Sequence, residues 1–280
     1  MNIENEINKA SVLLKKNNIK SAKLDSEILM SSVIQKSREF VILNLNQNLK
    51  KNYIYTFRKL IDKRSQGKPI AYLTGKKEFW KNEFNISEDV LVPRPETELI
   101  VEQVLKFSKN KNKLKILDIG VGSGCILLSI MAEKKRFQGV GVDINKKSLD
   151  MCKKNTIKLK LRNKIKFFKS DVDNFNYGKY DLIVSNPPYI NRLKLKYLEK
   201  DVAKFEPKIA LDGGLDGMSV IRKVIIKSSE LIKKNGKFFL EIGFDQKHKV
   251  KNILRDKGFF INKVIKDLAN NDRCIISTKI

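Results

Sequence analysis

The tetrapeptide Asn186-Pro187-Pro188-Tyr189 combines residue types that can hold a planar amino group still. The side-chain oxygen of Asn186 can accept one N–H, and proline has no N–H to engage the neighbouring carbonyls. Pro188 favours an extended Pro187, whose carbonyl can then face outward as a second acceptor. Tyr189 offers a flat apolar face to cover the group. The ordinary structural alternative is a Pro-Pro turn after a core strand, and the motif alone does not decide between the two.

The elements around this motif predict an α/β fold. Residues 180–185 form a short apolar run that ends at the motif, as expected for a buried strand of a parallel sheet. From residue 114 onward such runs alternate with helical patterns, which indicates a sheet covered on both faces. The predicted strands are 114–119, 138–143, 165–169, 180–185, 236–242, 259–267 and 273–279. Ligands of such sheets bind beyond the carboxyl ends of the strands, where the motif falls.

Three further strand ends carry residues suited to a nucleoside. A glycine-rich loop closes the first strand and opens a helix, and its glycines let the backbone approach a ligand. Asp143 ends the second strand, where a carboxylate can hold two ribose hydroxyls, and Asp171 ends the third and can accept from an adenine amine. Each carboxylate alone could equally be a turn residue or a helix cap. The loop residues are Asp118, Ile119, Gly120, Val121, Gly122, Ser123 and Gly124.

The region before residue 114 predicts two different parts. Residues 1–75 show helical spacing of apolar residues, with Ser21 as an expected N-cap, and predict a small bundle with no residue that looks catalytic. Residues 76–98 predict a β-hairpin connector that ends in Pro93-Arg94-Pro95-Glu96-Thr97-Glu98 and leads into a helix over 99–107. The third part, 99–280, would then carry the ligand site.

Composition narrows the class of protein. The chain has 58 basic and 31 acidic residues, a net charge of +27, which is compatible with a nucleic-acid or ribosomal partner and equally with a general compositional bias. The densest basic block is 146–169. Three widely spaced cysteines and a polar, acidic start, without an apolar run long enough for a membrane helix, predict a cytoplasmic protein with reduced thiols. A single histidine and no cysteine cluster make a metal site unexpected.

With these motifs in order along nearly the whole chain, the sequence resembles the release factor glutamine methyltransferases of the PrmC/HemK type. The resemblance rests on Pro69–Gly75, on Leu91–Glu98, on the glycine loop and on Val184–Ile190. It continues through Phe205-Glu206-Pro207, Ala210-Leu211, Asp216-Gly217 and Leu240-Glu241-Ile242-Gly243 to Arg273. The combination of Pro-Arg-Pro-Glu-Thr-Glu with Asn-Pro-Pro-Tyr is the specific part.

The resemblance implies a seven-stranded, Rossmann-like class I methyltransferase sheet, with S-adenosyl-L-methionine as the methyl donor. It implies that the acceptor is the glutamine of the Gly-Gly-Gln motif in class I peptide-chain release factors, gripped with help from the N-terminal domain. Asp118, Gly120, Val121, Gly122, Ser123, Gly124, Asp143, Asp171, Val172 and Asn186 would hold the cofactor. Arg94, Glu96 and the Asn186–Tyr189 motif would bind the substrate, with Asn186, Pro187 and Tyr189 catalytic. Val172 stands where some members carry an aromatic residue, so the packing of adenine stays open.

Two other functions fit parts of the sequence. A nucleic-acid amino-methyltransferase would use the same Asn-Pro-Pro-Tyr chemistry on adenine or guanine, with Tyr189 stacked on a flipped base. The positive charge favours this hypothesis, and the Pro93–Glu98 motif opposes it. A ribosome-binding module with a vestigial fold is the third hypothesis, which the intact glycine loop and Asn-Pro-Pro-Tyr motif oppose.

Overall fold

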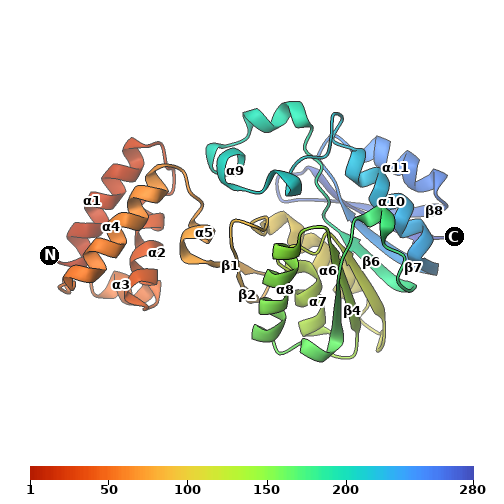
Figure 1. Ribbon diagram of the computed structural model, residues 1–280, viewed down its shortest axis with the longest axis horizontal. Coiled ribbons are helices and arrows are strands. Elements are labelled where there is room, and N and C mark those ends of the chain that lie inside the picture. Colours follow the sequence, from red (N-terminus) through yellow and green to blue (C-terminus); the bar gives the residue numbers. More distant parts are fainter. The chain divides into compact units, whose positions relative to one another are not determined.

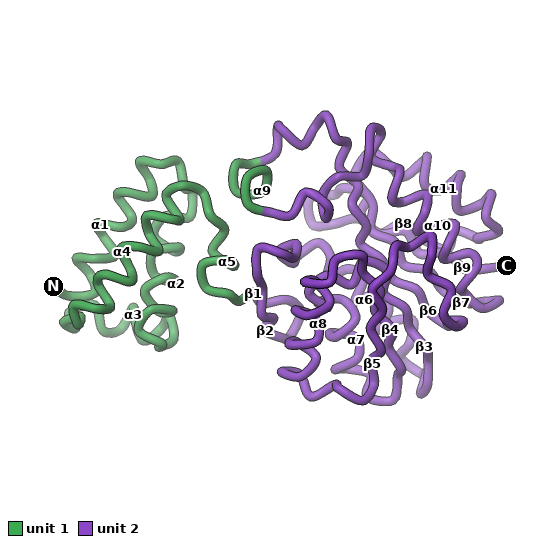
Figure 2. The backbone as a smooth tube through the Cα atoms, in the orientation of Figure 1, with its two compact units in different colours: residues 1–76, 199–205 green, residues 77–198, 206–280 purple.

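The computed structural model describes residues 1–280, and the chain divides into two compact units (Figure 2). The helical unit comprises residues 1–76 and 199–205, and the sheet unit comprises residues 77–198 and 206–280. The division predicted from the sequence, at residues 75 and 98, differs by treating the connector as a separate part and by leaving 199–205 with the C-terminal region. The predicted division into a substrate-binding domain, a connector and a methyltransferase domain stays a prediction.

The helical unit is built around one apolar core. Its elements are α1 (Ile3–Lys16), α2 (Ala22–Ile34), α3 (Arg38–Leu43), α4 (Lys51–Ser65), α5 (Ile70–Thr74) and α9 (Lys200–Phe205). Phe57 and Ile61 of α4 pack against apolar residues of α1 and α2, and Arg64 of α4 pairs with the buried Asp25 of α2 at 2.7 Å. Ser21 lies at the N-cap position of α2 as expected, but its side chain makes no capping hydrogen bond.

A β-hairpin and a stiff turn lead into the sheet unit. The hairpin consists of β1 (Lys76–Phe79) and β2 (Asn82–Asn85), and Trp80 in its turn has a positive φ of 56°. The turn is held because Trp80 N donates to Glu98 Oε1 at 2.7 Å. Residues 90–92, expected to follow as part of this connector, are irregular. The proline-rich motif forms the 3₁₀ helix η1 (Pro95–Thr97), followed by α6 (Glu98–Phe107).

Seven strands form one mixed sheet (Figure 1). They are β3 (Lys115–Ile119), β4 (Gln138–Asp143), β5 (Ile165–Lys169), β6 (Tyr180–Ser185), β7 (Ile232–Glu241), β8 (Phe259–Lys266) and β9 (Asp272–Lys279). Their order is β5-β4-β3-β6-β7-β9-β8, with β9 antiparallel to both of its neighbours. The predicted strands are confirmed, except that β7 begins four residues earlier than expected.

Alternate residues of each strand point to opposite faces of the sheet. Both faces carry apolar residues, and helices cover both. Phe238 of β7 packs with α10 (Ser219–Leu231) and α11 (Lys247–Asp256) in the main core. Its neighbour Phe239 instead meets Phe107 of α6, with ring centroids 6.3 Å apart. The remaining elements are α7 (Cys125–Glu133), α8 (Lys146–Lys158) and the 3₁₀ helices η2 (Arg162–Lys164), η3 (Val172–Asn174), η4 (Arg192–Tyr197) and η5 (Lys208–Ala210). None of the helices combines the length and apolar character that a membrane crossing requires.

Candidate active site

The strand register aligns five carboxyl ends at one edge of the sheet. Ile119 of β3 is paired with Val142 of β4 and with Ser185 of β6, and Asp143 of β4 with Lys169 of β5. On the other side, Ser185 is paired with Leu240 of β7. The glycine loop, Asp143, Asp171, Asn186 and Glu241 therefore emerge side by side, as the parallel topology predicted for the first four.

The glycine loop has a backbone that other residues would strain. Gly120 and Gly124 have φ values of 79° and 84°, a region that side chains with a Cβ rarely adopt. A Cβ on Gly124 would also lie 2.5 Å from Cys152 Sγ, whereas one on Gly120 would meet nothing within 4 Å. Gly120 thus opens towards free space, while Gly124 permits close packing where α7 begins. Such a loop presents backbone N–H groups to a ligand.

Asp143 shapes this loop as well as the ligand site. Its Oδ2 accepts from Gly122 N at 2.9 Å, and its Oδ1 accepts from Asn145 N at 2.8 Å. Burial raises the pKa of Asp143, and these backbone donors oppose the rise. Each carboxylate oxygen can accept more than one hydrogen bond, so Asp143 keeps acceptor capacity for hydroxyl groups.

A cavity of about 280 Å³ lies at the aligned strand ends. It is lined by eight of the residues predicted from the sequence: Gly120, Gly122, Asp143, Asp171, Val172, Asn186, Pro187 and Pro188. The remaining wall includes apolar residues from the connector (Val90 and Leu91) and from α10 (Val220 and Val224). Asp171 also caps η3, since its Oδ1 accepts from Asp173 N at 2.9 Å. Asp171 is thus a helix cap that also lines the cavity, and its role in ligand binding stays a prediction.

Asp118 lies beneath the loop and does not line the cavity. Its carboxyl is 1% exposed, and neither oxygen has a hydrogen-bond partner. Burial raises its pKa to about 8; the nearby backbone N–H of Leu127 opposes the rise, and Asp143 adds to it. A buried carboxyl without a partner is costly, and a positive charge brought close to it would relieve that cost. The site is therefore suited to a ligand that carries positive charge.

The Asn186 side chain is held from one side only. Its Nδ2 donates to Thr97 Oγ1 of η1 at 3.1 Å, which leaves Oδ1 as an acceptor without a partner in the protein. Thr97 is 2% exposed. The strand end beneath is fixed by Ser185, whose Oγ donates to Ile119 O at 2.7 Å. The Asn-Pro-Pro-Tyr motif is thus more than a turn, because its asparagine presents an acceptor at the wall of the cavity.

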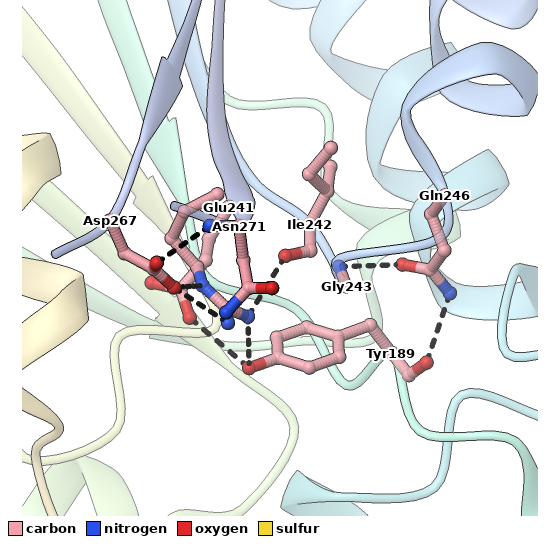
Figure 3. A network of polar contacts seen from close by, with 8 residues as sticks. Tyr189, Glu241, Ile242, Gly243, Gln246, Asp267 and Asn271 are labelled. Atoms are coloured by element: carbon pink, nitrogen blue, oxygen red, sulfur yellow. Dashed lines mark hydrogen bonds and ion pairs between the residues drawn. The ribbon is translucent and has the colours of Figure 1, made fainter. Parts of the chain in front are cut away.

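Tyr189 is anchored at both ends, as Figure 3 shows. Its hydroxyl donates to Glu241 Oε1 and accepts from Arg273 Nη1, each at 3.4 Å. Its carbonyl accepts from Gln246 Nε2 at 3.0 Å. Burial and the nearby Glu241 raise the pKa of the phenol, so it stays protonated at neutral pH. Tyr189 does not line the first cavity; it lines a second, of about 450 Å³, together with Arg273.

Glu241 lies in the apolar interior at the end of β7. It is 1% exposed, its Oε2 has no hydrogen-bond partner, and burial raises its pKa to about 7. Hydrogen bonds from Thr97 and Tyr189 and the charge of Arg273 oppose the rise. Arg273 itself is held by Asp267, with Nη2 and Oδ2 3.0 Å apart. Glu241 thus joins Thr97 on one side to Tyr189 and Arg273 on the other.

The two charged residues of the proline-rich motif lie in different environments. Arg94 forms an ion pair with the buried Glu206, with Nη2 and Oε1 2.5 Å apart. Glu206 Oε2 also accepts from Val92 N at 3.4 Å, so this pair fastens the motif to the segment before η5. Glu96 is exposed in η1. Neither residue lines either cavity, and their role in substrate binding stays a prediction.

Comparisons with known proteins agree with this architecture. Residues 7–75 match the family described as PrmC N-terminal domain, and residues 95–204 match the methyltransferase small domain. The release factor glutamine methyltransferase of Clostridium botulinum is 38% identical over 270 residues, which cover 95% of each chain. That of Buchnera aphidicola subsp. Schizaphis graminum is 37% identical over the full length of both chains. The chain belongs to the release factor glutamine methyltransferase family. It has the class I methyltransferase fold, and the predicted family and fold are therefore confirmed.

Family membership makes the chain a methyltransferase. The structure places further residues at the candidate site that the sequence analysis did not assign to it. The connector residues Asp89, Val90 and Leu91 contribute to the first cavity, as does Asn145 after β4. Asn145 Nδ2 also donates to Asp89 O at 3.3 Å, which ties the connector to the strand ends. Of the predicted cofactor residues, Val121, Ser123 and Gly124 lie behind the lining rather than in it. Thr97 and Glu241 were present in the quoted motifs without an assigned role.

Proposed function

We propose that this protein transfers a methyl group from S-adenosyl-L-methionine to the side-chain amide nitrogen of glutamine in the Gly-Gly-Gln motif of class I peptide-chain release factors. The observation that carries the proposal is the free Oδ1 of Asn186 in the wall of the cavity that Asp143 and the glycine loop also line. Relatives named release factor glutamine methyltransferase match the whole chain and support the same acceptor.

The residues present fit the cofactor. Asp143 would hold the ribose hydroxyls, Asp171 the adenine amine, and the apolar side chains of Leu91 and Val172 the faces of the ring. The unpaired buried carboxyl of Asp118 suits the positive charge of the donor. When bound, S-adenosyl-L-methionine supplies a methyl group on a positively charged sulfur, which makes that methyl electrophilic.

The protein's own contribution is to orient the acceptor. An amide nitrogen is a weak nucleophile because its lone pair is delocalised into the carbonyl. Asn186 Oδ1 and the Pro187 carbonyl would accept its two N–H groups and direct the nitrogen towards the cavity. Such orientation can lower a barrier by several kcal/mol, and by roughly 7–11 kcal/mol in well-oriented intramolecular reactions. The same acceptors would stabilise the positive charge that develops on the nitrogen.

The second cavity is the proposed entry for the acceptor loop. It adjoins Tyr189 and carries both signs of charge, because its lining includes Lys194, Lys249, Arg273, Asp216 and Asp245. Tyr189 would cover the amide once its nitrogen has passed from the second cavity to Asn186 at the wall of the donor cavity. We further propose that the helical unit helps to grip the release factor, and that the reaction takes place in the cytoplasm, where release factors act.

A nucleic-acid amino-methyltransferase remains the second candidate, because Asn186 and Pro187 would serve an exocyclic amine equally well and the net charge is +27. The basic block 146–169 gives this candidate limited support. Within it, Lys147 pairs with Asp89 at 2.9 Å and Lys158 with Glu83 at 2.7 Å, so part of the charge is already neutralised. A weak RNA or ribosome contact through this surface is a proposal only.

One experiment separates the two candidates. Purified protein is given labelled S-adenosyl-L-methionine together with release factor, with stripped RNA or with DNA, and the label in each acceptor is counted. We expect transfer to the release factor and its loss when the Gly-Gly-Gln glutamine is replaced by alanine. Transfer to RNA or DNA alone would reject the proposed substrate and favour the second candidate.

A further inference from the structure

The orientation of the Asn186 amide needs a physical cause. The oxygen and nitrogen of an amide have nearly the same size, so only their hydrogen-bond partners decide which of them faces the acceptor. The partner here is Thr97 Oγ1, 3.1 Å from Nδ2. A threonine hydroxyl can both donate and accept, so Thr97 alone does not fix the orientation.

Glu241 supplies the missing constraint. The pairing of Ser185 with Leu240 places Glu241 next to Asn186 at the ends of adjacent strands. The Thr97 hydroxyl lies close enough to Glu241 to oppose the rise of its pKa as a hydrogen-bond donor. An ionised carboxylate can only accept. The single hydroxyl proton of Thr97 is therefore directed to Glu241, and the oxygen of Thr97 is left to accept from Asn186 Nδ2.

We propose that Thr97 and Glu241 are positioning residues that fix the Asn186 amide so that Oδ1, and not Nδ2, faces the acceptor nitrogen. The inference rests on the proposed function, because it assumes an acceptor that carries an NH₂ group. If Glu241 gains a proton, it can donate to Thr97, whose own proton is then free to go to Asn186 Oδ1. The Asn186 amide would then rotate by half a turn and present its NH₂ group to the NH₂ group of the acceptor. Two donors cannot form a hydrogen bond with each other, so the acceptor would lose this contact.

The groups around Glu241 leave it as the titrating member of this network. Arg273 faces it from β9 and Glu96 from η1, and Arg273 is held positive by Asp267. Burial raises the pKa of Cys125 to about 12 and raises that of Cys274 and of the Tyr189 phenol, so these stay neutral. The Glu241 pKa of about 7 then predicts that methyl transfer weakens as the pH falls through neutrality.

The first test is single-turnover transfer to release factor by Thr97→Val and Thr97→Ser. Thr97→Val keeps the shape but removes the hydroxyl, and we expect the rate to fall about 10- to 100-fold, the effect of a small misplacement. The affinity for S-adenosyl-L-methionine should stay within about two-fold, and Thr97→Ser should retain most of the rate because it keeps the hydroxyl. Thr156→Val is the matched control, since Thr156 is also buried but donates to Cys152 O in α8.

The second test is the pH profile, which does not depend on how well the valine variant folds. Glu241→Gln should lose the fall in rate below neutral pH that we expect of the wild type. Glu133→Gln should keep that fall, because Glu133 of α7 is paired with Lys81 and lines neither cavity. Transfer by Thr97→Val within about three-fold of wild type, equal losses in Thr97→Val and Thr97→Ser, or an unchanged profile in Glu241→Gln would each overturn the proposal. Absence of transfer by the wild type would instead reject the proposed substrate.

Discussion

Replacing Asn186 with alanine removes the one side-chain acceptor that we place beside the reacting nitrogen. Within the protein, the change breaks a single hydrogen bond, the 3.1 Å contact with Thr97. Such a bond contributes about 0.5–1.5 kcal/mol, a small part of the roughly 5–15 kcal/mol that stabilise a typical domain. The Pro187 carbonyl belongs to the backbone and is retained. The variant should therefore fold and bind S-adenosyl-L-methionine.

The effect on the rate should be much larger than the effect on stability. Loss of one preorganised partner of the transition state costs roughly 2.7–4 kcal/mol, or about 100- to 1000-fold in rate. The measurement is single-turnover methyl transfer to release factor, alongside calorimetric affinity for the donor and a thermal melt. Asn176→Ala is a suitable control. Asn176 also makes one side-chain hydrogen bond, at 2.9 Å to Lys227, but it lies at the opposite end of β6 from Asn186.

Asn186→Asp sharpens the same prediction. It keeps an acceptor but leaves no donor for Thr97, and it brings a second negative charge near the buried Glu241. We expect donor binding to be kept or tightened, because the added charge lies near the positive sulfur, and methyl transfer to fail. If Asn186→Ala transfers methyl to release factor within a few-fold of wild type, the proposed active site is wrong. If it loses transfer only to nucleic acid, the second candidate function replaces the first.

Three further predictions concern the cofactor, the helical unit and pH. Asp143→Ala should weaken S-adenosyl-L-methionine binding by about 1.5–3 kcal/mol, the scale of hydrogen bonds to a charged group; unchanged calorimetric affinity in the folded variant would remove Asp143 from the site. Deletion of residues 1–75 should leave donor binding largely intact and sharply reduce methylation of whole release factor, and equal activity would refute a gripping role. Burial raises the Asp118 pKa from 3.8 to about 8, so the folded protein holds a proton that the unfolded chain releases, and this contribution to stability is lost as the pH rises through that range. Denaturant unfolding at about pH 5 and pH 8 should show a smaller decline for Asp118→Asn than for wild type, and equal declines would contradict the raised pKa.

The elements of the sheet could be predicted because each strand is a short apolar run between clear turn signals. Their order could not be predicted in the same way, since the runs that became β8 and β9 look alike and only tertiary pairing places β9 beside β7. The early start of β7 was missed for a local reason. Lys233, Lys234, Asn235 and Gly236 look like a turn, and Asn235 indeed has a positive φ of 63°, yet Ile232 pairs with Tyr180.

The residues of the site could likewise be predicted only in part. Asp143, Asp171 and Asn186 could be placed together from the sequence because parallel strands end at one edge. The contact between Thr97 and Asn186 joins residues 89 positions apart, and no pattern in the sequence indicates which side chain an asparagine amide will meet. Glu241 could have been singled out from the sequence, because an acidic residue at the end of an apolar strand is unusual. Asp118 occupies the same kind of position.

The membership of α9 in the helical unit has a consequence for the path of the chain. Because residues 199–205 pack with residues 1–76, the polypeptide passes from one unit to the other three times, after residues 76, 198 and 205. The second passage comes shortly after Tyr189, and the third leads directly to Glu206, the ion-pair partner of Arg94. A force applied to the helical unit would therefore reach the sheet unit at residue 198, shortly after Tyr189, and at residue 206, as well as at residue 77. A single N-terminal linker would give no such mechanical connection.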